Sequence, residues 1–194
     1  MDTQTPNETR DILEHWIKSS NRQIHTALPA SIVSYDAPSN RAAVKPFGNY
    51  KTRDYRNIPY PIIYDVPVIF PVGNGGRVGM TFPVNSGDGC LLVFAESQLD
   101  DYLTGGDSSD IRDHDMRDAI CIPGLYSEQA TTSKASQSDV CIYNGGTMIR
   151  ISDGAISITG ARLTIDGDVI AGGISLDKHT HTGDSGGKTS APNN

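Results

Sequence analysis

Residues 149–181 read IRISDGAISITGARLTIDGDVIAGGISLDKHTH, and this stretch decides the fold. Its apolar residues come in pairs two positions apart, and the first member of each pair recurs every seven residues. The repeat runs Ile149/Ile151, Ile156/Ile158, Leu163/Ile165 and then Ile170, with Gly154, Gly160, Gly167, Gly172 and Gly173 between the apolar positions. Two histidines, His179 and His181, follow directly.

The spacing of this repeat predicts strands and not a coiled coil, although both can have a period of seven. Coiled coils place apolar residues three and four positions apart. A spacing of two puts them on one face of a strand but on nearly opposite sides of a helix. A glycine in every unit would also cost a helix about 1 kcal/mol each. Isoleucines alternating with Ser, Thr and Arg therefore indicate short β-strands joined by tight turns.

Such strands carry too few apolar side chains to fold alone. Ordering one residue costs roughly 1–2 kcal/mol of backbone entropy, and repeat units need neighbours to bury their faces. The segment 140–176 is short for a single-chain solenoid. We therefore expect several identical chains wound around one axis with the Ile/Leu face inward, which makes the protein an obligate oligomer.

The composition of the 194-residue chain reduces the number of function classes that fit it. A net charge of −7 and a pI near 5.1 make the chain a poor candidate for nucleic-acid binding. The first ten residues are polar, unlike a signal peptide, and no apolar run approaches the roughly 20 residues that span a bilayer. We expect assembly in a cytoplasm. The three cysteines lack framework spacing, which predicts buried free thiols at Cys90 and Cys121.

The N-terminal segment, residues 1–28, is expected to form a helix. Thr5 and Glu8 match a capping box, and Pro6 suits the first helical position. Apolar residues then recur on one face up to Pro29, which ends the helix: Ile12, Leu13, Trp16, Ile17 and Ile24. This face packs on its own domain, associates with itself, or docks the oligomer to a partner. The first two alternatives are favoured, because apolar helix faces usually serve cores.

The rest of the chain is predicted to be all-β. Residues 29–126 contain five or six short strands, including 30–35, 41–47, 67–70, 78–83 and 90–95, together with a single helical turn at 99–103. That pattern favours a small barrel such as the OB-fold. A linker is expected at residues 127–139. It is expected to be followed by an intertwined trimeric β-helix at 140–176 and by a metal-binding apex at 177–194.

The candidate metal ligands are His179 and His181, whose side chains point the same way in a strand. Two imidazoles are too few for a tight site, but three chains around a threefold axis would supply six. Six nitrogen ligands imply octahedral geometry, which disfavours zinc and suits iron(II) or nickel. With no open position, the metal would be structural. The alternative is a solvated pair in a mobile tail.

Two other patterns could suggest enzymatic chemistry. Residues 183–187, Gly-Asp-Ser-Gly-Gly, match the loop around the nucleophilic serine of trypsin-like proteases, but seven residues after it are too few for a substrate pocket. Five aspartates with Arg112, Arg117 and His114 lie in 107–118, where a solvated loop with local ion pairs is the favoured interpretation. No catalytic residue is assigned, and the predicted protein is not an enzyme.

Taken together, these segments resemble the central spike proteins of contractile-tailed phages and related secretion-system and bacteriocin spikes. The OB-fold phrases that carry the resemblance are residues 32–36, 42–46, 66–71, 73–76, 81–84, 87–94, 105–106, 112–114 and 118–120. The repeat and His179-Thr-His181 resemble the needle and its iron-binding tip. The N-terminal helix has no counterpart in the resemblance.

The resemblance implies a homotrimer at the tip of the tail baseplate, beneath a hub protein, that pierces the host outer membrane when the sheath contracts. It implies one iron ion per trimer, held by six histidines from three chains. Two alternatives stay open on the residues alone. One is a metal-dependent hydrolase that uses His179, His181 and Asp184 or Ser185. The other is an OB-fold binding module with a trimerising tail.

Overall fold

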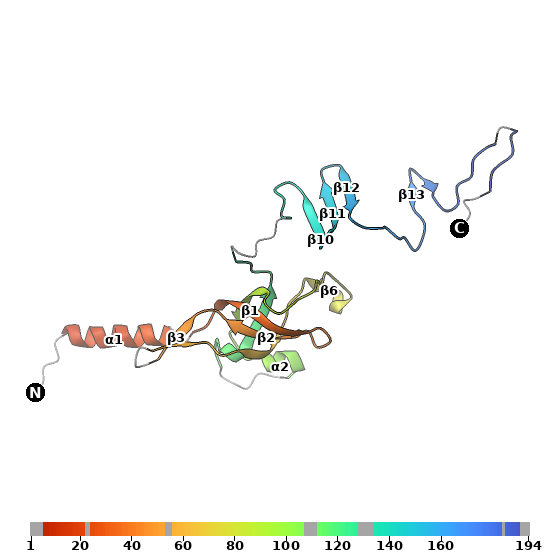
Figure 1. The fold of residues 1–194 in the computed structure, drawn as a ribbon. Helices are drawn as coiled ribbons and strands as arrows, with labels where there is room; N and C mark the ends of the chain where they lie inside the picture. The colour runs from red at the N-terminus through yellow and green to blue at the C-terminus, as the bar shows by residue number, and fades with distance from the viewer. Residues whose placement is uncertain are drawn as a thin grey trace, which may run out of the picture. The chain divides into compact units, whose positions relative to one another are not determined.

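The structure is a computed structural model, and it describes residues 6–21, 24–52, 56–106, 112–127, 134–183 and 185–190. The chain divides into two compact units, residues 1–132 and 133–194. The division falls within the Ser- and Thr-rich segment at 127–139, where the sequence predicts a linker. Figure 1 shows the elements of both units, which we describe one at a time.

The first element is helix α1, Pro6–Asn21. It begins at the expected proline, whereas the capping residue Thr5 lies outside the described residues. Arg10 and Lys18 both pair with Glu14 at a spacing of four, which supports the helix by a few tenths of a kcal/mol per pair. The prediction that the helix continues to Pro29 is wrong. Residues from Ala27 onward form a strand, so Ile24 lies outside the helix.

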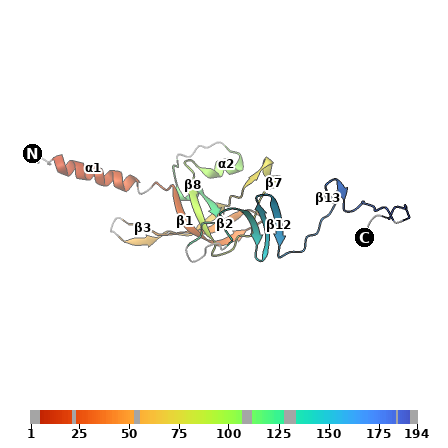
Figure 2. The same ribbon diagram turned by 90° about the horizontal axis from the view of Figure 1, so that it is seen from above.

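A five-stranded antiparallel sheet follows and curls into a barrel (Figures 1 and 2). Its order is β5-β2-β1-β8-β9. A parallel bridge between Val68 and Cys121 joins the two ends of the sheet, and the Ile69 amide donates to the Cys121 carbonyl at 2.9 Å. This order, with parallel closure, is that of the expected OB-fold. The strands are β1 (Ala27–Asp36), β2 (Arg41–Pro46), β5 (Ile63–Pro67), β8 (Gly89–Phe94) and β9 (Ala119–Pro123).

The barrel core comes from the inward positions of these strands. Along β8 every second residue is buried, which is the period-two pattern of a strand with one face on the core. Register shifts between Ile32 and Ser34 and between Ala42 and Val44 mark bulges that increase twist and help the sheet to curl. The core residues are Ile32, Ala42, Val44, Val66, Val68, Phe70, Val84, Cys90, Leu92, Phe94, Ala119 and Cys121.

The two buried cysteines are free thiols, which confirms the sequence prediction. A hydrogen bond with the Cys90 thiol, together with burial, raises the pKa of the Cys121 thiol. The same hydrogen bond lowers the pKa of the Cys90 thiol. Both side chains are fully buried in the barrel core, where they contribute to packing.

Two short hairpins and three short helices accompany the barrel strands among the described residues. The hairpins leave the barrel as β3–β4 (Asn49–Lys51 and Asn57–Pro59) and β6–β7 (Val72–Gly73 and Val78–Gly79), and the short 3₁₀ helix η1 (Asn74–Gly76) turns the second one. The strand predicted at 78–83 is therefore only two residues long, and the one predicted at 67–70 lies earlier, at β5. Helix α2 (Leu99–Thr104) confirms the predicted helical turn, and the 3₁₀ helix η2 (Met116–Asp118) leads into β9.

A substitution of Gly89, at the start of β8, would test the packing of the barrel. Its carbonyl accepts from the Gly124 amide at 3.0 Å, and a methyl group at Gly89 would overlap the Leu125 carbonyl oxygen. Because that neighbour is backbone, we expect Gly89→Ala to lower the free energy of unfolding by about 1–3 kcal/mol in urea titrations. Gly106→Ala is the matched control, since its methyl group meets only ordinary contacts at 3.6 Å. Equal stability of the two variants would contradict this packing.

The second unit begins with a three-stranded antiparallel meander in the order β10-β11-β12. Its strands are β10 (Val140–Asn144), β11 (Thr147–Ser152) and β12 (Ala155–Thr159). The chain continues to a small hairpin, β13 (Ile170–Ala171) and β14 (Ile174–Ser175), that turns at Gly172 and Gly173, both with positive φ. The expected strands with glycine turns are thus present for the first two repeats, whereas Leu163 and Ile165 lie outside any strand.

Candidate metal-binding apex and oligomerisation face

The meander gathers the repeat on one face. Its register pairs Val140 with Ile151 and Ile151 with Ile156, and it pairs Ile142 with Ile149 and Ile149 with Ile158. Because side chains at paired positions lie on the same side of a sheet, these six aliphatic side chains share one face of the meander, with the polar pair Asn144 and Thr147 at its end. We call it the aliphatic face, and its members are Val140, Ile142, Ile149, Ile151, Ile156 and Ile158.

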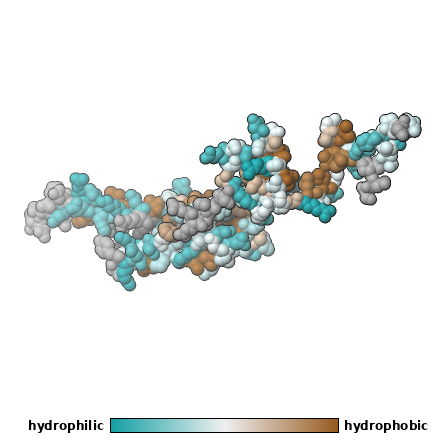
Figure 3. All heavy atoms as spheres, turned by 45° about the horizontal axis from the view of Figure 1, so that its top comes forward, coloured by the Kyte–Doolittle hydropathy of each residue, from teal (hydrophilic) through white to brown (hydrophobic). Residues whose placement is uncertain are grey.

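The aliphatic face is open to solvent in the single chain. Ile156 is 70% exposed and Val140 is 61% exposed. Exposure continues along the unit to its end, and Figure 3 shows hydrophobic side chains on the surface of this part of the chain. A soluble protein rarely exposes so many aliphatic side chains without a binding partner. The further exposed members are Leu163, Ile165, Ile170, Ile174 and Leu176.

The opposite face of the meander contacts the preceding segment of its own chain. The Lys134 ammonium lies 5.1 Å from the centre of the Tyr143 ring and donates to the Gly145 carbonyl. Asp139 accepts from the Arg150 guanidinium at 2.8 Å. Hydrogen bonds from Ser152 and Arg150 lower the pKa of Asp139. The polar face thus has intramolecular partners, and the aliphatic face is the one available to another molecule.

His179 is held by the backbone just before it. Its Nδ1 lies 2.9 Å from the Ser175 carbonyl oxygen and 3.0 Å from that of Leu176, and its own amide donates to Ser175 at 3.1 Å. Carbonyl oxygens only accept hydrogen bonds, so Nδ1 must carry the proton. The lone pair of the neutral imidazole is then on Nε2, the nitrogen that can bind a metal.

His181 lies in a chain reversal. Its amide donates to Thr189 Oγ1 at 2.8 Å, and the Thr189 amide donates back to the His181 carbonyl at 2.8 Å. A bridge between Thr182 and Lys188 continues this pairing. The chain turns back at Gly183 to Gly187, where Gly186 has a φ of 76°. L side chains rarely adopt a positive φ of this size, so glycine suits position 186 of this turn.

The two histidines lie together. Their ring centroids are 5.1 Å apart, with the ring planes at 86°. Among the described residues no group of three or more His, Cys, Asp or Glu could hold a metal ion, so these two imidazoles would need donors from elsewhere. Of the residues weighed for hydrolysis, Asp184 lies outside the described residues, and Ser185 is exposed in the turn.

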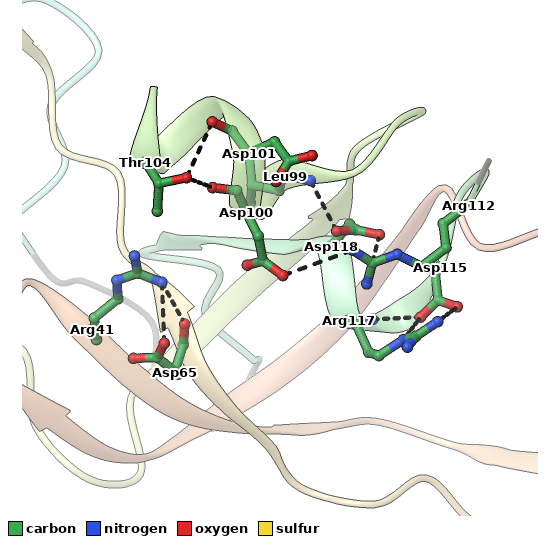
Figure 4. Close-up of polar contacts among 10 residues, drawn as sticks. All are labelled: Arg41, Asp65, Leu99, Asp100, Asp101, Thr104, Arg112, Asp115, Arg117 and Asp118. Carbon is green, nitrogen blue, oxygen red and sulfur yellow. Dashed lines mark hydrogen bonds and ion pairs between the residues drawn. The ribbon is translucent and has the colours of Figure 1, made fainter. Parts of the chain in front are cut away.

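The acidic segment before β9 differs from its sequence interpretation. Asp118 is only 1% exposed, so it is not part of a solvated loop. Its Oδ1 accepts from the Leu99 amide at the start of α2 at 2.9 Å, and its Oδ2 lies 3.9 Å from Arg112, which also pairs with Asp100 at 3.7 Å (Figure 4). This network ties α2 to the barrel. Positions 107–111 of the segment lie outside the described residues.

Asp115, by contrast, does form the predicted local ion pair. It accepts from the amide and the guanidinium of Arg117 at 2.9 and 3.0 Å and thereby caps η2 (Figure 4). These Arg117 hydrogen bonds lower the pKa of Asp115 to about 2. Both Asp115 and Arg117 serve local structure.

Sequence reasoning missed two features that matter here. Val140 and Ile142 belong to the aliphatic face, and their spacing of two could have added them to the repeat. The two carbonyl contacts that orient His179 had no sequence signal, because they depend on how the backbone turns after β14.

Within the described ranges, neither α1 nor α2 has the length and hydrophobicity that a bilayer-crossing helix requires.

Comparison with known families identifies the class of protein. Residues 28–124, half of the chain, match the family described as Phage protein Gp138 N-terminal domain. Residues 173–193, which contain both histidines, match the family described as GpV Apex motif. No curated protein matches the chain. The chain belongs to the phage baseplate central spike family, to which these two features belong. It is therefore a structural protein of the phage tail baseplate, and the resemblance stated from the sequence is confirmed.

Proposed function

We propose that the chain is the membrane-piercing spike at the tip of a contractile baseplate and acts as a homotrimer. The observation that carries the proposal is the aliphatic face, which is exposed while the opposite face of the same sheet contacts its own chain. Burying a single Val or Ile side chain stabilises an assembly by about 1.5–3 kcal/mol. Six such residues per chain make association strongly favourable.

An arrangement of three copies around one axis would both bury the aliphatic face and bring the histidines of the three chains together. Three meanders with inward aliphatic faces would enclose a dry core, and their outward faces would carry polar residues such as Arg150. A symmetric ring of this kind also leaves fewer open strand edges. The same axis would bring six imidazoles together, two from each chain. A trimer that is cross-linked at its apex would resist fraying when it is driven through an outer membrane.

The apex residues suit a metal ion with a structural role. The Nδ1 contacts of His179 leave its Nε2 as the free donor, as second-shell hydrogen bonds do in known metal sites. Six imidazole nitrogens match an octahedral ion, and iron is our choice over nickel because of the family resemblance. When bound, the ion would cross-link the three chains and leave no position for substrate. We accordingly propose a non-enzymatic protein that assembles with a baseplate hub.

Native mass spectrometry of the untagged protein is the experiment that tests this proposal. The protein is purified without chelators from cells grown with ample iron. We expect a trimer that carries a single metal atom. A monomer, or one metal per chain, would contradict the threefold arrangement and move the hydrolase or binding-module alternative forward.

A further inference from the structure

The turn that follows β14 carries His179, and its backbone amides have acceptors nearby in the chain. The Lys178 amide donates to the Ser175 hydroxyl at 2.8 Å, and the His179 amide donates to the Ser175 carbonyl at 3.1 Å. Ser175 therefore caps this turn as an N-terminal serine caps a helix. The Leu176 amide donates to the Val169 carbonyl at 2.8 Å, which ties the turn to the residue before β13.

Asp168 supplies the acceptor for the remaining amide of the turn. Its Oδ1 accepts from the Asp177 amide at 3.1 Å. A hydrogen bond from the Ser175 hydroxyl and the one from the Asp177 amide lower the pKa of Asp168, so its carboxylate is ionised at neutral pH. Ionised acceptors form hydrogen bonds roughly twice as strong as neutral ones. Asp168 is thus the charged acceptor among the groups that hold this turn.

A short series of contacts leads from Asp168 to the imidazole of His179. The carboxylate accepts from the Ser175 hydroxyl, and the Ser175 carbonyl oxygen lies 2.9 Å from His179 Nδ1. Because the hydroxyl and the carbonyl belong to one residue, fixing the first restricts the direction of the second. That carbonyl in turn requires the proton of the neutral imidazole to be on Nδ1, which leaves Nε2 as the donor for a metal.

We propose that Asp168 is a positioning residue for His179 and acts on it through Ser175. The inference rests on the proposed metal-binding apex and adds a residue outside the apex match, which begins at residue 173. In metal sites the partner of the non-ligating imidazole nitrogen fixes the tautomer and the ring orientation. That partner is here a backbone carbonyl, which has no side chain of its own to hold it, and Asp168 holds it instead.

The tautomer of His179 provides a readout that does not require the metal. Protein with isotopically labelled histidine ring nitrogens is freed of metal with a chelator and studied by NMR at about pH 8, where free imidazole is neutral. His179→Ala identifies the signals. We expect the wild type to show a fixed Nδ1–H tautomer at His179. Asp168→Ala should show a mixture of the two tautomers, because the Ser175 carbonyl is no longer held.

The release of iron(II) from the full-length trimer to excess EDTA provides the second readout. Loss of an outer partner of a metal-binding histidine typically costs 10–100-fold in metal affinity. We therefore expect Asp168→Ala to release iron at least about tenfold faster than the wild type. Asp168→Asn keeps an oxygen that can accept from the Asp177 amide and should release iron more slowly than Asp168→Ala.

Asp166→Ala is the matched control, because it removes the same charge two positions earlier. Asp166 is exposed, as Asp168 is, and the amides of residues 176–179 donate to other acceptors. Both readouts should match the wild type. Ser175→Ala tests the same contacts from the other end, since it removes the hydroxyl and keeps the carbonyl. It should change both readouts in the direction of Asp168→Ala.

The two readouts separate this proposal from the proposed metal site. A mixed tautomer and faster iron release in Asp168→Ala, with neither in Asp166→Ala, support the positioning role. An unchanged tautomer, unchanged release, or an equal effect of Asp166→Ala overturns it. If the wild-type trimer binds no iron, the metal site is overturned, and the tautomer alone decides whether Asp168 positions His179. If Asp168→Ala does not assemble, Ser175→Ala decides by the same criteria.

Discussion

Ile156→Asp is expected to convert the trimer into monomers. Ile156 projects from β12 on the aliphatic face, where the proposed trimer would bury three copies of the new carboxylate near one axis. Burying unpaired charges costs several kcal/mol. Since each 1.4 kcal/mol is a tenfold change in equilibrium constant, we expect trimer affinity to fall by at least about a hundredfold. Sedimentation velocity over a micromolar concentration series measures it.

Ser157→Asp is the control for this experiment. Ser157 is the next residue of β12, points to the opposite face and pairs in register with Arg150. The same charge is thus introduced one position away, beside a cation, and the trimer should persist. If Ile156→Asp remains as trimeric as Ser157→Asp, the aliphatic face is not the oligomer interface.

The paired substitution His179→Ala with His181→Ala is expected to abolish metal binding while the trimer stays assembled. The aliphatic face precedes both residues in the sequence and includes neither, so its packing should survive. Elemental analysis of protein purified without chelators should fall from one metal per trimer to background. Native mass spectrometry on the same sample checks the trimer.

Thr180→Ala is the matched control for the metal experiment, because Thr180 lies between the two histidines and offers no imidazole. It should retain the metal. The proposal of a metal-locked apex is wrong if the wild-type trimer, prepared from iron-replete cells, holds no metal, or if the double variant keeps it.

Much of the fold could be predicted because it follows from local patterns of apolar residues and glycines in the sequence. Alternation in β8 and the apolar pairs of the repeat reflect which side chains face a core, and Gly154 and Gly160 mark turns that need positive φ. The end of α1 could not be predicted in this way. Ile24 fits the helical period, but the residues from Ala27 onward gain more by pairing with β2 and β8. Tertiary pairing overrode local spacing there.

The features of the candidate site likewise separate into those that local sequence patterns predict and those that depend on the tertiary structure. Sequence alone determined the apolar repeat and the two histidines and predicted the need for neighbouring chains, since spacing and residue type are local properties. Only the tertiary structure decided which face of the meander contacts its own chain, which nitrogen of His179 carries the proton, and that Asp118 is buried under α2. Those features depend on segments distant in sequence or on backbone turns, and such contacts have no periodic signature along the chain.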